Sequence, residues 1–305
     1  MLDETIASLD TARDLFEQAG ESGDYVIVLD PLRVRLDVDG DGTTGADETF
    51  APFAAALFGS GAEELTAKQK SKGVTGLSQG IGLDRADALW LAGYSQVVAA
   101  PLDWLLAHDF HAFYDAYLHR VFPKAGLPMA DYASGATLFM DADSDAGIAD
   151  LIAGIHMLRF PVTDSDRLAG VLDRLKAIPA LSRRNWDAIL AETDDNLELV
   201  PSPSQTSLVP GQRVTQEMVD AWLATLDRVD AVLAGELLLP HWRFRQGFDL
   251  ALYFAEATET DLVLILTGQG AVPFLRDGPI ADAQDFADGN RVFGDDWPLF
   301  ALWFN

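Results

Sequence analysis

The chain has no cysteine, few lysines and no long apolar run. None of its 305 residues is cysteine, and only five of its 21 basic residues are lysines. The lack of cysteine excludes disulfide scaffolds, thiolate metal sites and cysteine nucleophiles. No segment approaches the 18 uninterrupted apolar residues of a transmembrane helix, so we expect no membrane span.

Positive charge is scarce relative to negative charge. The chain carries 48 acidic and 21 basic residues, which gives a net charge of −27. A field of this sign repels nucleic-acid phosphates and anionic lipid, so we expect no nucleic-acid partner, whereas divalent cations are attracted. Adaptation to salt or to a GC-rich genome is the alternative explanation of the same composition.

What the chain does have is enough apolar material for a large core. Hydrophobic residues make up 49% of the sequence, with seven Trp and 17 Phe, and this composition excludes the disordered class. A chain of this length forms one large domain or two closely packed ones. We predict a single large domain over 1–305, with room for an internal boundary near 198–213, the longest unpatterned stretch.

The spacing of apolar residues favours helix through most of the chain. It predicts a helix over 3–19 and an extended segment near 26–38, where Pro31 favours a sheet edge or a bend. A short buried strand is predicted in "TDLVLILTG". Further helices are predicted over 48–58, 84–99, 101–121, 147–158, 164–178, 182–192 and 215–234, several of them bounded by proline. The predicted fold class is therefore mainly α with a small β element (α+β).

Residues 36–48 read "LDVDGDGTTGADE", and this stretch is the most informative in the chain. Alternate short carboxylates on a tightly turning chain converge on one point, and a calcium ion requires roughly six to eight oxygens there. Gly42 follows the third aspartate and permits the sharp turn. We name residues 37–48 the acidic loop. Its predicted calcium ligands are the side chains of Asp37, Asp39, Asp41 and Glu48 and the carbonyl group of Thr43.

The acidic loop resembles the calcium loop of EF-hand proteins at every ligand type that this pattern fixes. The resemblance covers about a dozen residues and implies Ca²⁺ as the bound ion. It departs at Thr44, where an apolar residue is usual, and in the extended segment before the loop, where an EF-hand has a helix. We therefore expect a strand–loop–helix setting. An acidic turn that caps a helix beginning near Asp47 is the alternative.

A second acidic run, "FMDADSDAGIADLI", repeats the alternation at Asp141, Asp143 and Asp145. Its glycine comes one residue late, and Ile152 stands where the closing glutamate would be. We predict a second, weaker cation site at these three aspartates. The alternative is that Asp145 or Ser144 only caps the helix that follows.

Three of the five histidines lie in "AHDFHAFYDAYLHRVF", which we name the histidine segment. On a single helix, His108, His111, Asp115 and His119 would share one face. Pairs of these side chains one turn apart could bind zinc or iron together with ligands from elsewhere in the chain. The polar face of an amphipathic helix is the alternative.

Carboxylates also gather at a helix end in "AETDDNLE". Glu192, Asp194 and Asp195 are candidates for acid–base catalysis, which depends on a separation between carboxyl groups that a sequence does not reveal. The sequence thus predicts a calcium-binding globular protein and names no reaction. The alternative is a metal-dependent hydrolase with structural calcium and a second site on the histidine segment. Since free calcium is abundant outside the cytosol, we expect an extracytoplasmic protein whose signal has been removed, with the cytoplasm as the alternative.

Overall fold

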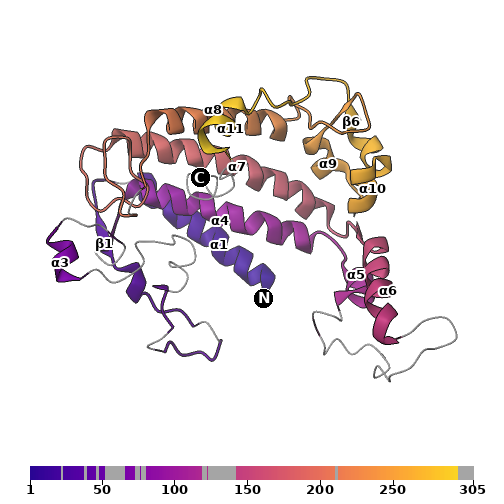
Figure 1. The fold of residues 1–305 in the computed structure, drawn as a ribbon, viewed down its shortest axis with the longest axis horizontal. Helices are drawn as coiled ribbons and strands as arrows, with labels where there is room; N and C mark the ends of the chain where they lie inside the picture. The colour runs from indigo at the N-terminus through magenta and orange to yellow at the C-terminus, as the bar shows by residue number, and fades with distance from the viewer. Residues whose placement is uncertain are drawn as a thin grey trace. The chain divides into compact units, whose positions relative to one another are not determined.

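The computed structural model describes residues 1–21, 23–37, 40–45, 48–51, 66–72, 76, 80–118, 122, 142–209 and 212–294. These residues are mainly helical and include small antiparallel sheets of two strands each (Figure 1). The predicted α+β class with a dominant α component is therefore confirmed. Of the helices in these ranges, none is long and apolar enough to cross a membrane.

The chain forms two compact units, each with its own hydrophobic core. Unit 1 comprises Met1–Val98, Ala177–Asp227 and Gln284–Asn305, and unit 2 comprises Ala99–Lys176 and Arg228–Ala283. The segment 198–213, for which the sequence allowed a boundary, lies inside unit 1. Three of the four boundaries between the units fall instead within helices, α4 (Arg85–Leu106), α7 (Ser165–Ala191) and α8 (Gln216–Leu233), and the fourth falls in the turn between Ala283 and Gln284.

Unit 1 combines parts of the three long helices with short elements from both ends of the chain. Its first sheet pairs β1 with β2 in antiparallel register, with Ile27 opposite Leu83. Besides the long helices, the elements of unit 1 are α1 (Leu2–Glu21), β1 (Ile27–Leu29), η1 (Pro31–Arg33), α3 (Ala67–Lys70), β2 (Ile81–Leu83) and α11 (Ala287–Phe293).

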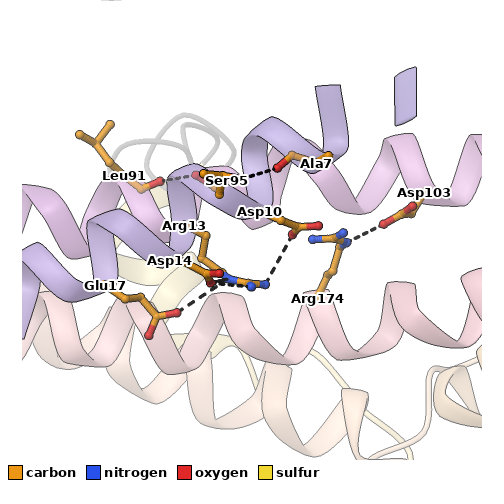
Figure 2. Close-up of polar contacts among 10 residues, drawn as sticks. Ala7, Asp10, Arg13, Asp14, Glu17, Leu91, Ser95, Asp103 and Arg174 are labelled. Carbon is orange, nitrogen blue, oxygen red and sulfur yellow. Dashed lines mark hydrogen bonds and ion pairs between the residues drawn. The ribbon is translucent and has the colours of Figure 1, made fainter. Parts of the chain in front are cut away.

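The core of unit 1 is built around two buried tryptophans. Trp186 of α7 and Trp222 of α8 are 0% and 5% exposed and lie in one cluster of buried apolar side chains. Burial of such rings is the main favourable contribution to folding, worth about 25 cal/mol for each Å² of apolar surface removed from water. At its surface, α1 forms ion pairs through Arg13, which contacts Asp10 and Asp14 of the same helix (Figure 2).

Unit 2 carries two small antiparallel sheets among short helices. Arg159 of β3 lies opposite Asp261 of β5, and Gly247 of β4 lies opposite Arg276 of β6. The elements are α5 (His111–Ala116), α6 (Ala142–His156), β3 (Arg159–Pro161), β4 (Gly247–Phe248), α9 (Leu250–Glu256), β5 (Glu259–Asp261), α10 (Leu262–Thr267), η4 (Gln269–Phe274) and β6 (Leu275–Arg276).

A partly buried ion-pair group joins two helices of unit 2. The carboxylate of Asp103 in α4 accepts hydrogen bonds from Arg174 at 2.6 Å and from Arg167 at 3.0 Å, both in α7. Figure 2 shows Arg174 reaching across to Asp103. One carboxylate thus neutralises part of two guanidinium charges, and the pair geometry fixes α4 against α7 inside this unit.

The structure confirms the positions of several predicted helices but not always their ends. α1, α6 and α8 correspond to the helices predicted over 3–19, 147–158 and 215–234. The predicted stops at Pro101 and Pro179 are wrong, because α4 and α7 run through these residues. Pro179 is fully buried, and its packing offsets the roughly 3 kcal/mol cost of proline inside a helix.

Two further predictions about elements of unit 2 are wrong. The helix predicted over 101–121 is interrupted, since α4 ends at Leu106 and α5 begins at His111. The strand predicted in "TDLVLILTG" is a helix, α10, which starts where the side chain of Asp261 accepts the N–H of Leu264 at 2.7 Å. A capping aspartate before an unbroken apolar run favours helix even when the run contains β-branched residues.

Candidate functional site

The acidic loop is organised by hydrogen bonds from its own backbone. Asp37 Oδ1 accepts the N–H groups of Gly40 and Asp41 at 2.8 and 3.1 Å, and its Oδ2 accepts the N–H of Gly42 at 2.9 Å. Asp41 Oδ1 accepts the N–H and the hydroxyl of Thr43 at 2.8 and 2.7 Å. The carboxylate groups therefore hold the turn in shape, as aspartate does in loops of this kind.

Two glycines give the acidic loop its curvature. Gly40 and Gly42 have φ angles of +74° and +86°, in the left-handed region that side chains rarely adopt. A Cβ atom at either position would meet no atom within 4 Å, so the requirement for glycine is conformational and not one of space. This is the reason that a calcium loop of the EF-hand type has glycine after its third acidic residue.

Antiparallel pairing closes the base of the acidic loop. The N–H of Leu36 donates to the carbonyl of Glu48 at 2.9 Å, and the N–H of Phe50 donates to the carbonyl of Val34 at 2.8 Å. The chain thus enters the loop in an extended conformation, as predicted, and leaves it extended through Thr49. The helix predicted over 48–58 therefore does not begin at its predicted start, and residues 52–58 of that prediction lie outside the described residues. The side chain of Glu48 turns back into the loop and accepts the N–H of Gly45. The pairing of Leu36 with Glu48 therefore brings the backbone at the start of the loop, at Asp37, next to the backbone at its end, at Glu48.

The donor set of the acidic loop suits a hard cation. It consists of oxygen atoms alone, and the bonds that Thr43 donates through its hydroxyl and its N–H lower the pKa of Asp41, which keeps this carboxylate ionised. Asp39 lies outside the described residues. Within the described ranges, no group of three or more His, Asp or Glu side chains is placed to hold a metal ion. The ligand role of the loop thus stays a prediction.

The second acidic run falls at the start of α6. Asp141 lies outside the described residues, and α6 begins at Ala142, so Asp143 and Asp145 belong to its first turns. The alternative in which Asp145 or Ser144 caps the helix is wrong, because the helix begins before both of them. Carboxylates in a first helical turn are stabilised by the positive end of the helix dipole, whether or not a cation is bound.

The histidine segment does not form a single face. His108 lies past the end of α4 and is buried, whereas His111 opens α5 and is exposed. Both ring nitrogens of His108 have partners, and Nδ1 of His111 contacts Oδ1 of Asp109 at 2.6 Å, a bond that raises the pKa of His111. Asp115 lies on α5, and His119 lies outside the described residues. The expected shared face of His108 and His111 is therefore wrong, because the helix breaks between them.

In "AETDDNLE", Glu192, Asp194 and Asp195 all accept hydrogen bonds, Asp194 through its backbone carbonyl and the other two through their carboxylates. Asp195 accepts the N–H and the hydroxyl of Thr206 at 2.7 and 3.0 Å, and the backbone carbonyl of Asp194 accepts the side-chain amide of Gln205 at 3.0 Å. The same amide donates to Oε2 of Glu192 at 2.9 Å. These bonds tie the segment after α7 to the loop that follows it.

Glu192 belongs to a group of acidic side chains that sequence reasoning missed. Its carboxyl group lies close to that of Asp84, and burial raises the pKa of Glu192 to about 8. Burial likewise raises the pKa of Asp87 and of Glu198 to about 7. We name Asp84, Asp87, Glu192 and Glu198 the carboxyl cluster. At neutral pH the carboxyl groups of Asp87, Glu192 and Glu198 hold protons that isolated carboxyl groups would have released.

Only two residues of the carboxyl cluster, Asp84 and Asp87, belong to a pattern that can be recognised in the sequence. Asp84 and Asp87 form a reciprocal cap at the start of α4: Asp84 Oδ1 accepts the N–H of Ala86 at 2.7 Å, and Asp87 Oδ2 accepts the N–H of Asp84 at 2.9 Å. The spacing of these two residues before an apolar run is the sequence pattern of such a cap. The proximity of Asp84 to Glu192 is a tertiary contact between residues more than 100 positions apart, and no local pattern encodes it.

Comparisons with known proteins give no relative for this chain. No family model, no curated protein and no solved structure matches it. A proposal about its function therefore rests on the chemistry of the described side chains.

Proposed function

We propose that the protein binds a calcium ion in the acidic loop and that this ion stabilises unit 1. The observation that carries the proposal is a run of oxygen donors at alternate positions from Asp37 to Thr43, with Gly42 in the left-handed conformation and Glu48 brought back by the pairing at the base of the loop. Residues of these types at these positions are those that a calcium loop requires.

Calcium suits this loop better than other common metals. The chain offers no thiolate, and the loop offers no imidazole, so the soft and borderline metals that prefer these donors have little advantage. Magnesium requires a small, near-octahedral shell and gives up its water ligands reluctantly, whereas calcium accepts the irregular shell of a flexible loop. We accordingly propose a calcium-rich, extracytoplasmic setting for the protein.

A second and weaker ion is part of the same proposal. Asp141, Asp143 and Asp145 would supply three carboxylates, but Ile152 takes the place of the closing glutamate. Fewer charged ligands lower calcium affinity, so this site would fill only at about 10⁻⁴–10⁻³ M calcium. The alternative of a metal-dependent hydrolase on the histidine segment has less support, because His108 has both ring nitrogens engaged in hydrogen bonds.

Calorimetric titration of the chelator-treated chain with calcium tests the proposal. We expect one tight site in the wild type and at least about a tenfold loss of affinity in Asp37→Asn, which keeps the shape of the side chain but removes its charge, equivalent to about 1.4 kcal/mol. Binding should also raise the melting temperature, because a ligand of the folded state alone stabilises that state by mass action.

The matched control is Asp277→Asn, which removes the same charge from an exposed position in unit 2. It should leave the affinity for calcium unchanged. Wild-type affinity in Asp37→Asn, or equal affinity for calcium and magnesium in the wild type, would rule out the acidic loop as the site.

A further inference from the structure

A closed chain of four hydrogen bonds lies in the core of unit 2. Nδ1 of His108 contacts the carbonyl of Trp104 at 2.6 Å, and Nε2 contacts the hydroxyl of Thr260 at 2.8 Å. The Thr260 hydroxyl also contacts the hydroxyl of Tyr253 at 2.6 Å, which accepts the indole N–H of Trp104 at 3.1 Å. We name these four residues the His108 network. It joins the end of α4 to α9 and β5 and returns to the residue where it began.

Every hydrogen in the His108 network has one available position. The Trp104 carbonyl can only accept, so Nδ1 of His108 carries the hydrogen and Nε2 of the neutral ring accepts. Thr260 must then donate to Nε2, which leaves its oxygen to accept from Tyr253. The Trp104 indole can only donate, so the Tyr253 oxygen accepts from it while the Tyr253 hydrogen goes to Thr260. The hydrogen positions assigned from the Trp104 carbonyl and those assigned from the Trp104 indole therefore agree.

A proton added to His108 breaks this pattern. Nε2–H would then point at the Thr260 hydroxyl, whose own hydrogen would have to turn toward Tyr253. The Tyr253 oxygen would accept from both Thr260 and Trp104, and the Tyr253 hydrogen would lose its acceptor within the network. Because His108 and Thr260 are only 6% and 2% exposed, water does not replace the lost bond, and a buried donor without an acceptor is costly.

Within the described part of the chain, His108 has no charged partner that would stabilise an imidazolium ion. Its nearest rings are those of Trp104 and Phe110, with centroids 4.4 and 6.4 Å away. The acidic side chains on the elements packed around it are engaged elsewhere or lie in solvent. They are Asp103 with Arg167 and Arg174, Asp109 with His111, Asp164 with Arg167, Asp249 with the N–H of Leu252, Glu259 with Arg159, Asp261 with the N–H of Leu264, and the exposed Asp115, Asp166, Asp173 and Glu256.

The contacts of the Thr260 hydroxyl with His108 and Tyr253 do not make Thr260 a nucleophile. A hydroxyl that donates to an imidazole is the arrangement by which serine and threonine nucleophiles are activated. Thr260 is buried, however, and its oxygen already accepts from Tyr253. A substrate carbonyl has no access to it, so the imidazole acts on the fold and not on a substrate.

We propose that the His108 network is an acid-sensitive switch, in which protonation of His108 separates α9 and β5 from the end of α4 and opens the core of unit 2. Burial of the ring lowers the pKa of His108 below its ordinary value of 6.5, against the opposing effect of the Trp104 carbonyl. The stabilising contribution is therefore complete above about pH 6.5 and is lost as the pH falls. Within the folded unit the ring resists protonation, and once the unit opens it takes up a proton.

Hydrogen exchange of the full chain, corrected for the intrinsic pH dependence of exchange, tests this switch. Between pH 7.5 and pH 5, we expect amides of β3, β5 and α9 to lose up to about tenfold protection for each pH unit below 6.5. In His108→Gln, whose amide donates and accepts but does not titrate, protection of these amides should be equal at the two pH values. His111→Gln, at an exposed position, is the matched control and should behave as the wild type.

A second measurement does not depend on how any variant folds. Nitrogen NMR of the wild-type imidazole should show hydrogen on Nδ1 alone at pH 7.5 and no fast titration of the closed unit as the pH falls. A ring that titrates near pH 6.5 without change in exchange would overturn the proposal. So would acid-induced exchange that persists in His108→Gln.

Discussion

At the scale of single residues, Glu192 is a pH-sensitive side chain in unit 1. Its pKa is about 8 in the folded chain and 4.5 in an unfolded one, mainly because burial disfavours its charged form. Between these values the folded state binds more protons than the unfolded state. The free energy of unfolding therefore decreases as the pH rises from about 4.5 to 8.

Replacement of Glu192 by glutamine should remove part of this pH dependence. The amide has the same shape but carries no charge, so Glu192→Gln should stabilise unit 1 at pH 8 by about 1 kcal/mol after allowance for the partial exposure of the group. This corresponds to a rise in melting temperature of about 2–4 °C. At pH 4.5 the variant and the wild type should melt together. Glu4→Gln, at a highly exposed position on α1, should melt as the wild type at both pH values, and the same shift in this control would assign the effect to net charge alone.

The sequence shows which side chains can carry a charge, but not which of them are neutral in the folded chain. The loop motif could be recognised because all of its donors lie within 12 consecutive residues. The protons of Glu192 and the neutral ring of His108 depend on burial and on partners far away in the chain. Asp84 illustrates the difference: its role as a helix cap is local and could be predicted, whereas its proximity to Glu192 is tertiary and could not.

At the scale of secondary-structure elements, Asp103 links α4 to α7 in unit 2 through two ion pairs. Asp103→Ala would leave Arg167 and Arg174 without their shared carboxylate while both remain largely buried. Removing one partner of a buried ion pair costs about 3–5 kcal/mol, so we expect a loss near the lower end of that range. Chemical denaturation followed by circular dichroism measures it.

The control for Asp103 is Asp227→Ala, which removes the partner of Arg183 from an ion pair whose carboxylate is 69% exposed. An exposed pair contributes about 0–1 kcal/mol, so this variant should be close to the wild type. Equal losses in the two variants would mean that the burial of the Asp103 group has no energetic effect.

The elements themselves were predictable in type wherever local chemistry and burial agree. α1 and α8 have apolar residues at helical spacing and no internal proline, and the sequence placed both of them well. Pro101 and Pro179 were misread as helix ends, because the packing that offsets a proline inside a helix is not visible in sequence. α10 was misread as a strand because its apolar run was weighed more heavily than the cap at Asp261.

At the scale of the whole molecule, the two units should respond to pH in opposite directions. The carboxyl cluster makes unit 1 less stable as the pH rises toward 8, and the His108 network makes unit 2 less stable as the pH falls below 6.5. Calcium in the acidic loop would add stability to unit 1 alone. Hydrogen exchange followed separately for peptides of each core, at pH 5 and 8 with and without calcium, should therefore give opposite pH trends and a calcium effect confined to unit 1.

A common pH trend in both cores would show that the units open together and that neither group governs its own unit. A calcium effect on unit 2 alone would move the proposed ion from the acidic loop to the second acidic run, which lies in unit 2.

The distribution of the tryptophans has an optical consequence. Trp186 and Trp222 are buried in unit 1, Trp104 is hydrogen-bonded inside unit 2, and the ring of Trp242 is 74% exposed while its N–H donates to the carbonyl of Leu266. Indole emission shifts to longer wavelength with exposure to water, so among these four tryptophans we expect Trp242 to emit at the longest wavelength. Because a hydrogen bond holds its ring, we also expect its emission to be more polarised than that of a freely rotating surface indole.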